Sequence, residues 1–271
     1  MDLLKRDLAP ILSDAWRLID EEASRVLRLH LAARKLVDVD GPYGWHHAAV
    51  NVGRIAPVTT EEGPLRVEGV AVGVRRVQPL IELRASFELS MRELDNVARG
   101  AKDLALDAAV TAAERIARVE DAAVFYGLEA AGIQGIVPSS PHQKIALPAS
   151  VVDYPRAVAE ALEVLRKSGI AGPFALALGP KSYSELSQGA EEGYPIRKRI
   201  EQQLIDGPLV WAPALEGALV LSLRGGDFAL TIGHDLSVGY DWHDKEAIAL
   251  YLTESFTFRV LEPAAAVYLS H

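Results

Sequence analysis

The longest helical pattern of the chain lies between residues 94 and 132. Apolar residues recur there in steps of three and four, at Leu106, Ala109, Val110, Ala113, Ile116, Ala117, Ala123 and Val124. Polar residues recur with the same period on the opposite side, at Asp107, Thr111, Glu114, Arg118 and Asp121. Only Glu120 lies within the apolar stripe. We therefore predict one long amphipathic helix, ended by Gly127 or Gly132, as the spine of a domain.

A second amphipathic pattern covers residues 14–34, with Ser13 or Asp14 as its N-cap. Its apolar positions are Ile19, Ala23, Val26, Leu27 and Leu31. The first nine residues precede Pro10 and form a separate arm. Because this arm carries three leucines, it is too apolar for a free tail, and we expect it to pack on a neighbouring surface.

Residues 49–83 alternate apolar and polar side chains, as strands do. The alternation breaks at Glu61, Glu62, Gly63 and Pro64, which predicts an acidic turn between two strands. A two-stranded hairpin is only marginally stable by itself in water. This arm therefore needs a partner surface, from its own domain or from another chain.

The following segments alternate helix and strand. A helix at 156–167, a buried strand at 174–178, a short helix near 181–186 and strands at 209–211 and 218–223 predict a compact α/β unit over residues 133–222. Arg224-Gly225-Gly226-Asp227 then predicts a hairpin turn into a strand at 228–232, and further strands follow at 248–253 and 256–260. Because these strands must return to the long helix, the chain is predicted to be a discontinuous α+β domain with an inserted unit.

Composition excludes several kinds of site. The 271 residues include no cysteine, which removes disulfides, zinc–thiolate sites and thiol nucleophiles and is compatible with a reducing cytoplasm. The net charge of −9, without a basic patch, gives nucleic-acid binding little support. A charged N-terminus and the lack of a long apolar run argue against a signal peptide and membrane insertion. The apolar fraction of 49% fits a large core or surfaces buried between subunits.

The polar residues form no recognisable catalytic set. There is no Gly-x-Ser-x-Gly elbow, phosphate-binding loop or His-Glu-x-x-His helix. Adjacent His46 and His47 would point to opposite sides of a strand, so a shared metal is not expected. Four acidic or His-Asp pairs lie in predicted turns or loops without a companion nucleophile: Glu61–Glu62, Glu191–Glu192, His234–Asp235 and His243–Asp244. The residues by themselves indicate a non-catalytic, oligomeric α+β protein.

Seven segments, in order along the whole chain, resemble the encapsulin family of bacterial shell proteins, which build icosahedral nanocompartments on the Hong Kong 97-type phage-capsid fold. The segments are residues 4–10, 33–42, 79–84, 93–100, 193–195, 224–228 and 235–240. The resemblance implies a peripheral domain formed by residues 1–48, 84–132 and 223–271. Residues 49–83 would be the extended loop, which pairs with a neighbouring subunit, and residues 133–222 the axial domain.

The resemblance also implies two functional surfaces. A loop at the fivefold axis would line a pore, where Glu191 and Glu192 form a negative ring that attracts cations. This loop comprises Ser187, Gln188, Gly189, Ala190, Glu191, Glu192, Gly193 and Tyr194. A lumenal groove would bind a short C-terminal targeting peptide of a cargo enzyme, with Arg34 and Asp38 at family-like positions and Ile232 and Leu236 as its apolar floor.

The expected function is therefore that of a structural subunit, not of an enzyme, in a cytoplasmic iron-storage or peroxidase compartment. A 60-mer is the simplest icosahedral shell. A ferritin-like iron oxidase is favoured as cargo over a dye-decolorising peroxidase. No cofactor is expected, because residues 70–74 lack the aromatic residue of flavin-binding members. The alternatives are a phage major capsid protein of the same fold and, less favoured, a peptidase.

Overall fold

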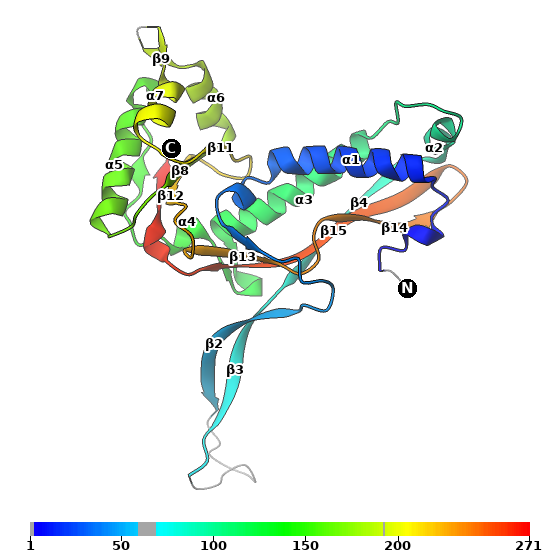
Figure 1. Ribbon diagram of the computed structural model, residues 1–271, viewed down its shortest axis with the longest axis horizontal. Coiled ribbons are helices and arrows are strands. Elements are labelled where there is room, and N and C mark those ends of the chain that lie inside the picture. Colours follow the sequence, from blue (N-terminus) through cyan, green and yellow to red (C-terminus); the bar gives the residue numbers. More distant parts are fainter. Residues whose placement is uncertain (1–2, 59–68, 192) are drawn as a thin grey trace.

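The computed structural model describes residues 3–58, 69–191 and 193–271. Figure 1 shows an elongated body with two units and a hairpin that projects from it. The helices are α1 (Ser13–His30), α2 (Met91–Ala98), α3 (Asp107–Tyr126), α4 (Ile136–Ser139), α5 (Tyr154–Lys167), α6 (Pro180–Gln188) and α7 (Ile196–Gln203). The strands are β1 (Asp38–Asp40), β2 (Ala49–Val58), β3 (Val72–Pro79), β4 (Ile81–Ser90), β5 (Gly127–Leu128), β6 (Ile133–Gln134), β7 (Ile145–Ala146), β8 (Phe174–Leu178), β9 (Ala190–Glu191), β10 (Tyr194–Pro195), β11 (Leu209–Trp211), β12 (Ala218–Ser222), β13 (Phe228–Ile232), β14 (Ser237–His243), β15 (Ala247–Val260) and β16 (Ala266–Ser270).

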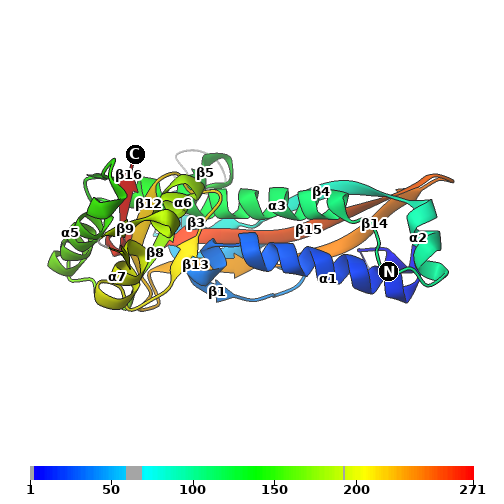
Figure 2. The same cartoon turned by 90° about the horizontal axis from the view of Figure 1, so that it is seen from above.

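The first unit is built on the long strand β15. Strand β4 pairs along one side of β15, and β14 and β13 follow one another along its other side, all antiparallel. Strand β1 adds in parallel to the edge of β13. Helices α1 and α3 lie side by side against this sheet (Figures 1 and 2). Their apolar stripes, with Ile19 of α1 and Ile116 of α3, pack with Leu250 of β15 in one core.

The second unit is a smaller mixed sheet in the order β11-β8-β12-β16-β7. Every residue of β8 and β12 is buried, which explains their continuous apolar sequences. Helix α5 packs Leu162 and Leu165 into the same core. The strand at 174–178 and the helix at 156–167 are confirmed, with α5 beginning two residues earlier.

The predicted projecting arm is confirmed as the β2–β3 hairpin, whose two strands, 49–58 and 72–79, contain no buried residue. Its strands leave the body together, since the N–H of Leu80 donates to the carbonyl of Ala48 at 2.9 Å. The arm ends at Pro79 rather than at residue 83, because β4 belongs to the body sheet. The predicted acidic turn at 61–64 lies outside the described residues.

The long helix predicted within residues 94–132 is present as α3, but the expectation of one continuous helical stretch from residue 94 is wrong. Helix α2 ends at Ala98 and α3 begins only at Asp107. Gly100 has a φ of +105°, and the N–H groups of Gly100 and Ala101 donate to the carbonyls of Val97 and Asn96. This pair of bonds is the Schellman arrangement that ends helices at a glycine. The predicted end of the spine at Gly127 is confirmed, with a φ of +89°.

The C-terminal strands also differ from the prediction. The turn at 224–227 joins β12 to β13, but these strands belong to different sheets, so it is no hairpin turn. The two strands expected at 248–253 and 256–260 are one strand, β15. Strand β14 was not predicted from periodicity. Strand β16 pairs with β12 and β7, so the range 223–271 does not lie wholly in the first unit.

The N-terminal arm packs on its own chain, as its leucines suggested. Arg6 forms a two-point ion pair with Asp20 of α1, with N–O distances of 2.5 and 2.8 Å. Its Nε donates to the carbonyl of Val238 at 2.7 Å, and the N–H of Tyr240 donates to the carbonyl of Leu4. The arm thus covers part of the outer edge of β14.

Candidate functional site

A buried carboxylate of α3 holds the turn that follows α1. The backbone N–H groups of Ala32 and Ala33 donate to Asp121 Oδ2 and Oδ1, each at 2.9 Å. Burial raises the pKa of Asp121 to about 7, although the two hydrogen bonds act in the opposite direction. Because the pKa is raised in the folded state, binding of this proton favours folding. This contribution to the free energy of unfolding is lost as the pH rises from about 4 through 7. The prediction that Asp121 faces water is wrong, because its partners are backbone groups that need a buried acceptor.

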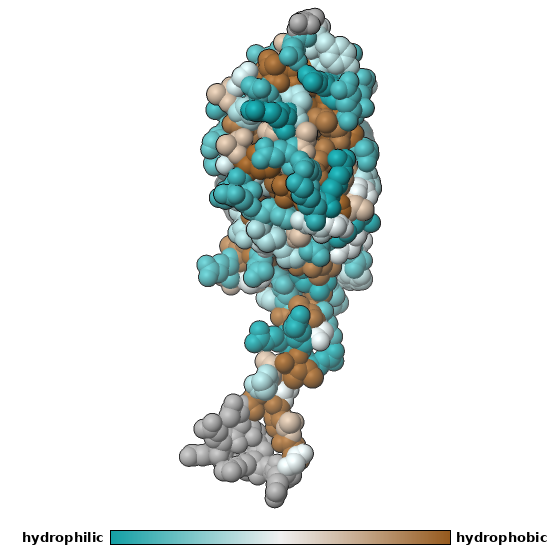
Figure 3. Space-filling model, turned by 90° about the vertical axis from the view of Figure 1, so that its left-hand side faces the viewer, coloured by the Kyte–Doolittle hydropathy of each residue, from teal (hydrophilic) through white to brown (hydrophobic). Residues whose placement is uncertain are grey.

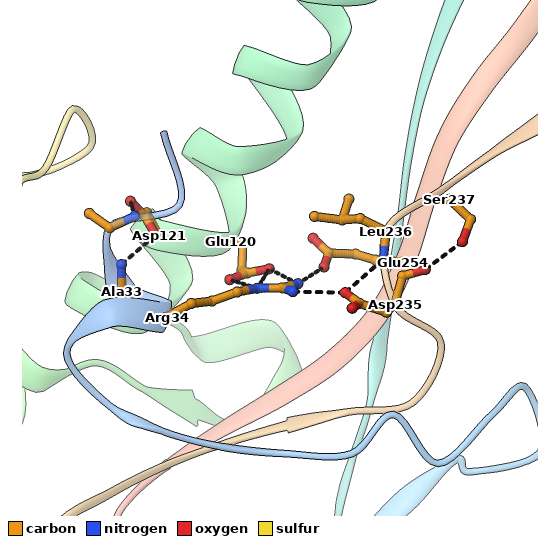
Figure 4. A network of polar contacts seen from close by, with 9 residues as sticks. Ala33, Arg34, Glu120, Asp121, Asp235, Leu236, Ser237 and Glu254 are labelled. Atoms are coloured by element: carbon orange, nitrogen blue, oxygen red, sulfur yellow. Dashed lines mark hydrogen bonds and ion pairs between the residues drawn. The ribbon is translucent and has the colours of Figure 1, made fainter. Parts of the chain in front are cut away.

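The 3₁₀ turn Ala33–Lys35 places Arg34 between three carboxylates (Figure 4). Arg34 Nε donates to both oxygens of Glu120 at 2.9 and 3.0 Å, and Nη2 donates to Glu120 Oε2 at 2.6 Å. Nη2 also contacts Glu254 Oε2 at 2.9 Å, and Nη1 contacts Asp235 Oδ1 at 2.7 Å. Arg34 therefore joins α3, β15 and the connection from β13 to β14.

The electrostatics of this network follow from its burial. Burial by itself lowers the pKa of Arg34, but the carboxylates of Glu120, Glu254 and Asp235 together raise it above its ordinary value. Burial, and then the nearby Glu120, raises the pKa of Glu254 well above the ordinary value of a glutamate. Arg34 stays a cation, whereas Glu254 favours its protonated form.

A groove lies beside the network, between α1 and the connection that carries Asp235. It has a volume of about 330 Å³. Its lining combines leucines with three cationic side chains and one carboxylate: Ser24, Leu27, Arg28, Leu31, Arg34, Lys35, Asp235 and Leu236. One N–H of Arg34 Nη1 and the Oδ2 atom of Asp235 take no part in the hydrogen bonds described above, so they can bond to a ligand. This lining suits an apolar peptide whose backbone supplies one acceptor and one donor.

The structure brings together two of the four residues expected to bind cargo. Arg34 and Leu236 line the groove. Asp38 lies with Arg34 along a separate cavity of about 200 Å³, and its Oδ2 accepts from the N–H of Gly226 at 2.6 Å. Ile232 does not form the floor of the groove, because it is 2% exposed and packs in the core. That choice is corrected: β13 is buried on both faces at this position.

Sequence reasoning missed Glu254 and the part played by Glu120 and Asp235. The available signal was a charged residue within an apolar pattern. Glu120 interrupts the stripe of α3, and Glu254 interrupts the apolar residues of β15. Such a residue is fully buried only with a partner, and here both share Arg34.

The expected pore loop lies at the tip of the second unit. Ser187 and Gln188 belong to the last turn of α6, not to a loop. Ala190 and Glu191 pair with Tyr194 and Pro195 in the short β9–β10 hairpin, around Gly193. Glu191 contacts Arg199 of α7 at 2.9 Å. Glu192 lies outside the described residues.

Neither a metal site nor a nucleophile stands out. Residues 3–58, 69–191 and 193–271 contain no group of three or more His, Asp or Glu side chains that fits a metal ion. Ser182 Oγ lies 3.0 Å from His271 Nε2, but Ser182 has no exposed surface to offer a substrate. Among the helices of this described part, none is long and apolar enough to span a membrane.

Comparison with known proteins gives consistent matches along the chain. Residues 1–257 match the family model described as an encapsulating protein for peroxidase. The type 1 encapsulin shell protein of Brevibacterium linens is 46% identical over 270 residues, covering all of both chains.

Solved structures support the fold independently. The virus-like particle of Pyrococcus furiosus matches with a TM-score of 0.64 at 17% identity, covering 94% of this chain and 98% of the other. The capsid of the cyanophage P-SCSP1u matches with a TM-score of 0.50 at 12% identity, covering 88% and 87%. These structures share the phage-capsid fold with this chain.

Proposed function

The chain belongs to the encapsulin family of shell proteins and has the Hong Kong 97-type phage-capsid fold, and from this premise we propose that it assembles into a closed icosahedral compartment around a cargo enzyme. The identity of 46% over all of a type 1 shell protein carries this proposal. Icosahedral symmetry requires sixty equivalent positions or a multiple, and sixty copies is the size we propose. The relatives are named as shell proteins, so the role that we propose is structural. The compartment would lie in the cytoplasm. The units built on β15 and on β8 would be the peripheral and axial domains.

The test is electron microscopy of the full chain expressed alone, with light scattering for mass. Uniform hollow particles of about sixty subunits are expected. A monodisperse monomer or dimer would contradict the proposal and reopen the peptidase alternative. Particles filled with nucleic acid would favour the phage-capsid alternative, which the net charge of −9 opposes.

The groove beside Arg34 is the proposed site for the targeting peptide of the cargo. Its leucines would accept apolar side chains, while Arg34 and Asp235 would bond to the peptide backbone. The description of the matching family names peroxidase as what its members enclose. This favours a peroxidase as cargo over the ferritin-like oxidase that was expected from the resemblance. Mass spectrometry of shells isolated from the source organism identifies which enzyme is enclosed.

Leu236→Asp is expected to reduce the cargo that copurifies with assembled shells by at least tenfold. A carboxylate in the apolar part of the groove would have to be desolvated when the peptide binds. Leu29→Asp is the matched control, since Leu29 is 51% exposed on α1 and does not line the groove. Equal cargo content in both variants and the wild type would place the peptide elsewhere.

The tip of the second unit is the proposed pore lining. Arg199 partly neutralises Glu191, so the negative ring would depend strongly on Glu192. The double variant E191Q/E192Q is expected to slow the entry of Tb³⁺ into assembled shells several-fold, because repeated negative charges concentrate cations at an opening. Stopped-flow luminescence of an enclosed chelator measures this entry. An unchanged rate would exclude these glutamates as the cation-attracting group.

A further inference from the structure

The charges around Arg34 do not balance if all its partners are ionised. One guanidinium contacts Glu120, Glu254 and Asp235. The side chains of Glu120 and Glu254 have no exposed surface, whereas that of Asp235 is 49% exposed. Two neighbouring carboxylates without water are costly to ionise together, even beside one cation. A single bound proton removes this excess charge.

The hydrogen bonds indicate that Glu254 holds the proton. Glu120 receives bonds from both Nε and Nη2 of Arg34, the arrangement that best stabilises a carboxylate. Glu254 receives one bond, at Oε2, and its buried Oε1 has no hydrogen-bond partner. Protonation removes the buried charge of Glu254, and the neighbouring Glu120 carboxylate can accept the hydrogen bond of the resulting hydroxyl.

Charged and titratable groups face Glu254 from each element packed on it. These are Arg34 of the 3₁₀ turn, Glu120 of α3 and Asp235 of the β13–β14 connection, while β4 places the apolar Leu83 opposite Glu254. Asp121 is occupied by the N–H groups of Ala32 and Ala33. His234 stacks on Trp45 with ring centres 3.6 Å apart. Arg34 is therefore the cation that Glu120, Glu254 and Asp235 share by direct contact.

We propose that Glu254, in its protonated form, is a positioning residue for the groove: it leaves Arg34 free to hold Asp235, and with it Leu236, against α1. The functional meaning of this proposal rests on the proposed function, in which the groove binds cargo. Its structural part does not. Loss of the proton adds a second buried negative charge beside Arg34. Among the three carboxylates, Asp235 reaches water at the lowest cost, because it is half exposed.

The movement of Asp235 would change the groove itself. The N–H of Leu236 donates to Asp235 Oδ1 at 2.8 Å, and Ser237 Oγ donates to the carbonyl of Asp235 at 2.9 Å. These bonds join Ser237 to Asp235 and Leu236, the two residues that form a wall of the groove. Alkaline pH therefore loosens this wall, and the groove retains its shape at neutral and mildly acidic pH.

Hydrogen exchange of the full chain, read by mass spectrometry between pH 6 and pH 9, tests the proposal without any peptide. After correction for the intrinsic rate, protection at residues 235–238 in the wild type is expected to fall with pH, by up to tenfold per pH unit. E254Q, which resembles the protonated residue, is expected to keep constant protection. E163Q is the matched control and should retain the pH dependence of the wild type, because Glu163 is an exposed glutamate of α5 that pairs with Lys167.

Two results would overturn the proposal: constant wild-type protection over this pH range, or the same pH dependence in E254Q as in the wild type. A merely structural role for Glu254 would change protection in E254Q equally at all pH values. Constant wild-type protection would overturn the proposal even if E254Q does not fold. Failure of cargo to bind at any pH would instead reject the cargo groove and leave the exchange result intact.

Discussion

Replacing Arg34 with alanine is expected to lower the free energy of unfolding by about 3–5 kcal/mol, because it leaves carboxylates buried without their counter-charge. Glu120 and Glu254 are both fully buried, and Arg34 is the cation that contacts them. Without it, Glu120 must be protonated as well as Glu254, or the packing between α3 and β15 must break. The loss should therefore be larger at pH 8 than at pH 5.

Urea unfolding followed by tryptophan fluorescence measures this effect. All variants must be compared at one protein concentration, since assembly adds to apparent stability. Arg28→Ala is the matched control, because Arg28 is an exposed residue of α1 and surface substitutions change stability by about 0.5 kcal/mol or less. Equal midpoints for the two variants would mean that the network contributes little to the fold.

Local elements were predictable where one physical signal dominated. The continuous apolar run at Phe174–Leu178 gave its strand to the residue, whereas the stripe of α1 gave the start of the helix within one residue but placed its end at residue 34 instead of His30. The break at Gly100 was missed because apolar spacing was followed across a helix-ending glycine. The lesson is that backbone signals take precedence over periodicity when the two conflict.

The arrangement of strands was less predictable from sequence. Local pattern does not reveal that β12 and β13, joined by five residues, enter different sheets. The single strand β15 was divided because Glu254 and Ser255 looked like a polar connection. A charged residue in a strand is compatible with burial when a distant Arg34 neutralises it, and that partner is 220 residues away.

The candidate site was also predictable only in part. Arg34 and Leu236 came from family resemblance and line one groove. Ile232 was assigned to the same groove on the resemblance but is buried, and alternation along a strand cannot distinguish an open face from one covered by a second element. Side-chain burial on both faces of a strand depends on tertiary packing, which no local pattern contains.

Deleting the β2–β3 hairpin is expected to abolish shell assembly while leaving a folded subunit. Ile55, Val70 and Val74 are 69%, 58% and 59% exposed, and Figure 3 shows brown apolar residues along the projecting arm. An exposed apolar ribbon of this kind is a surface for another chain. The body should fold without it, because strands β2 and β3 add no residue to either core.

The deletion can be made with little strain. Residues 49–79 are replaced by Asn-Gly, a two-residue turn, since Ala48 and Leu80 are joined by a 2.9 Å hydrogen bond. Circular dichroism should report a folded chain, and light scattering a mass at least tenfold below that of the wild-type particle. Ile55→Asp tests the same contact with one substitution, and Ile55→Val, which keeps the apolar surface, should assemble normally. Full-size particles from the deletion variant would show that contacts between the bodies suffice for closure.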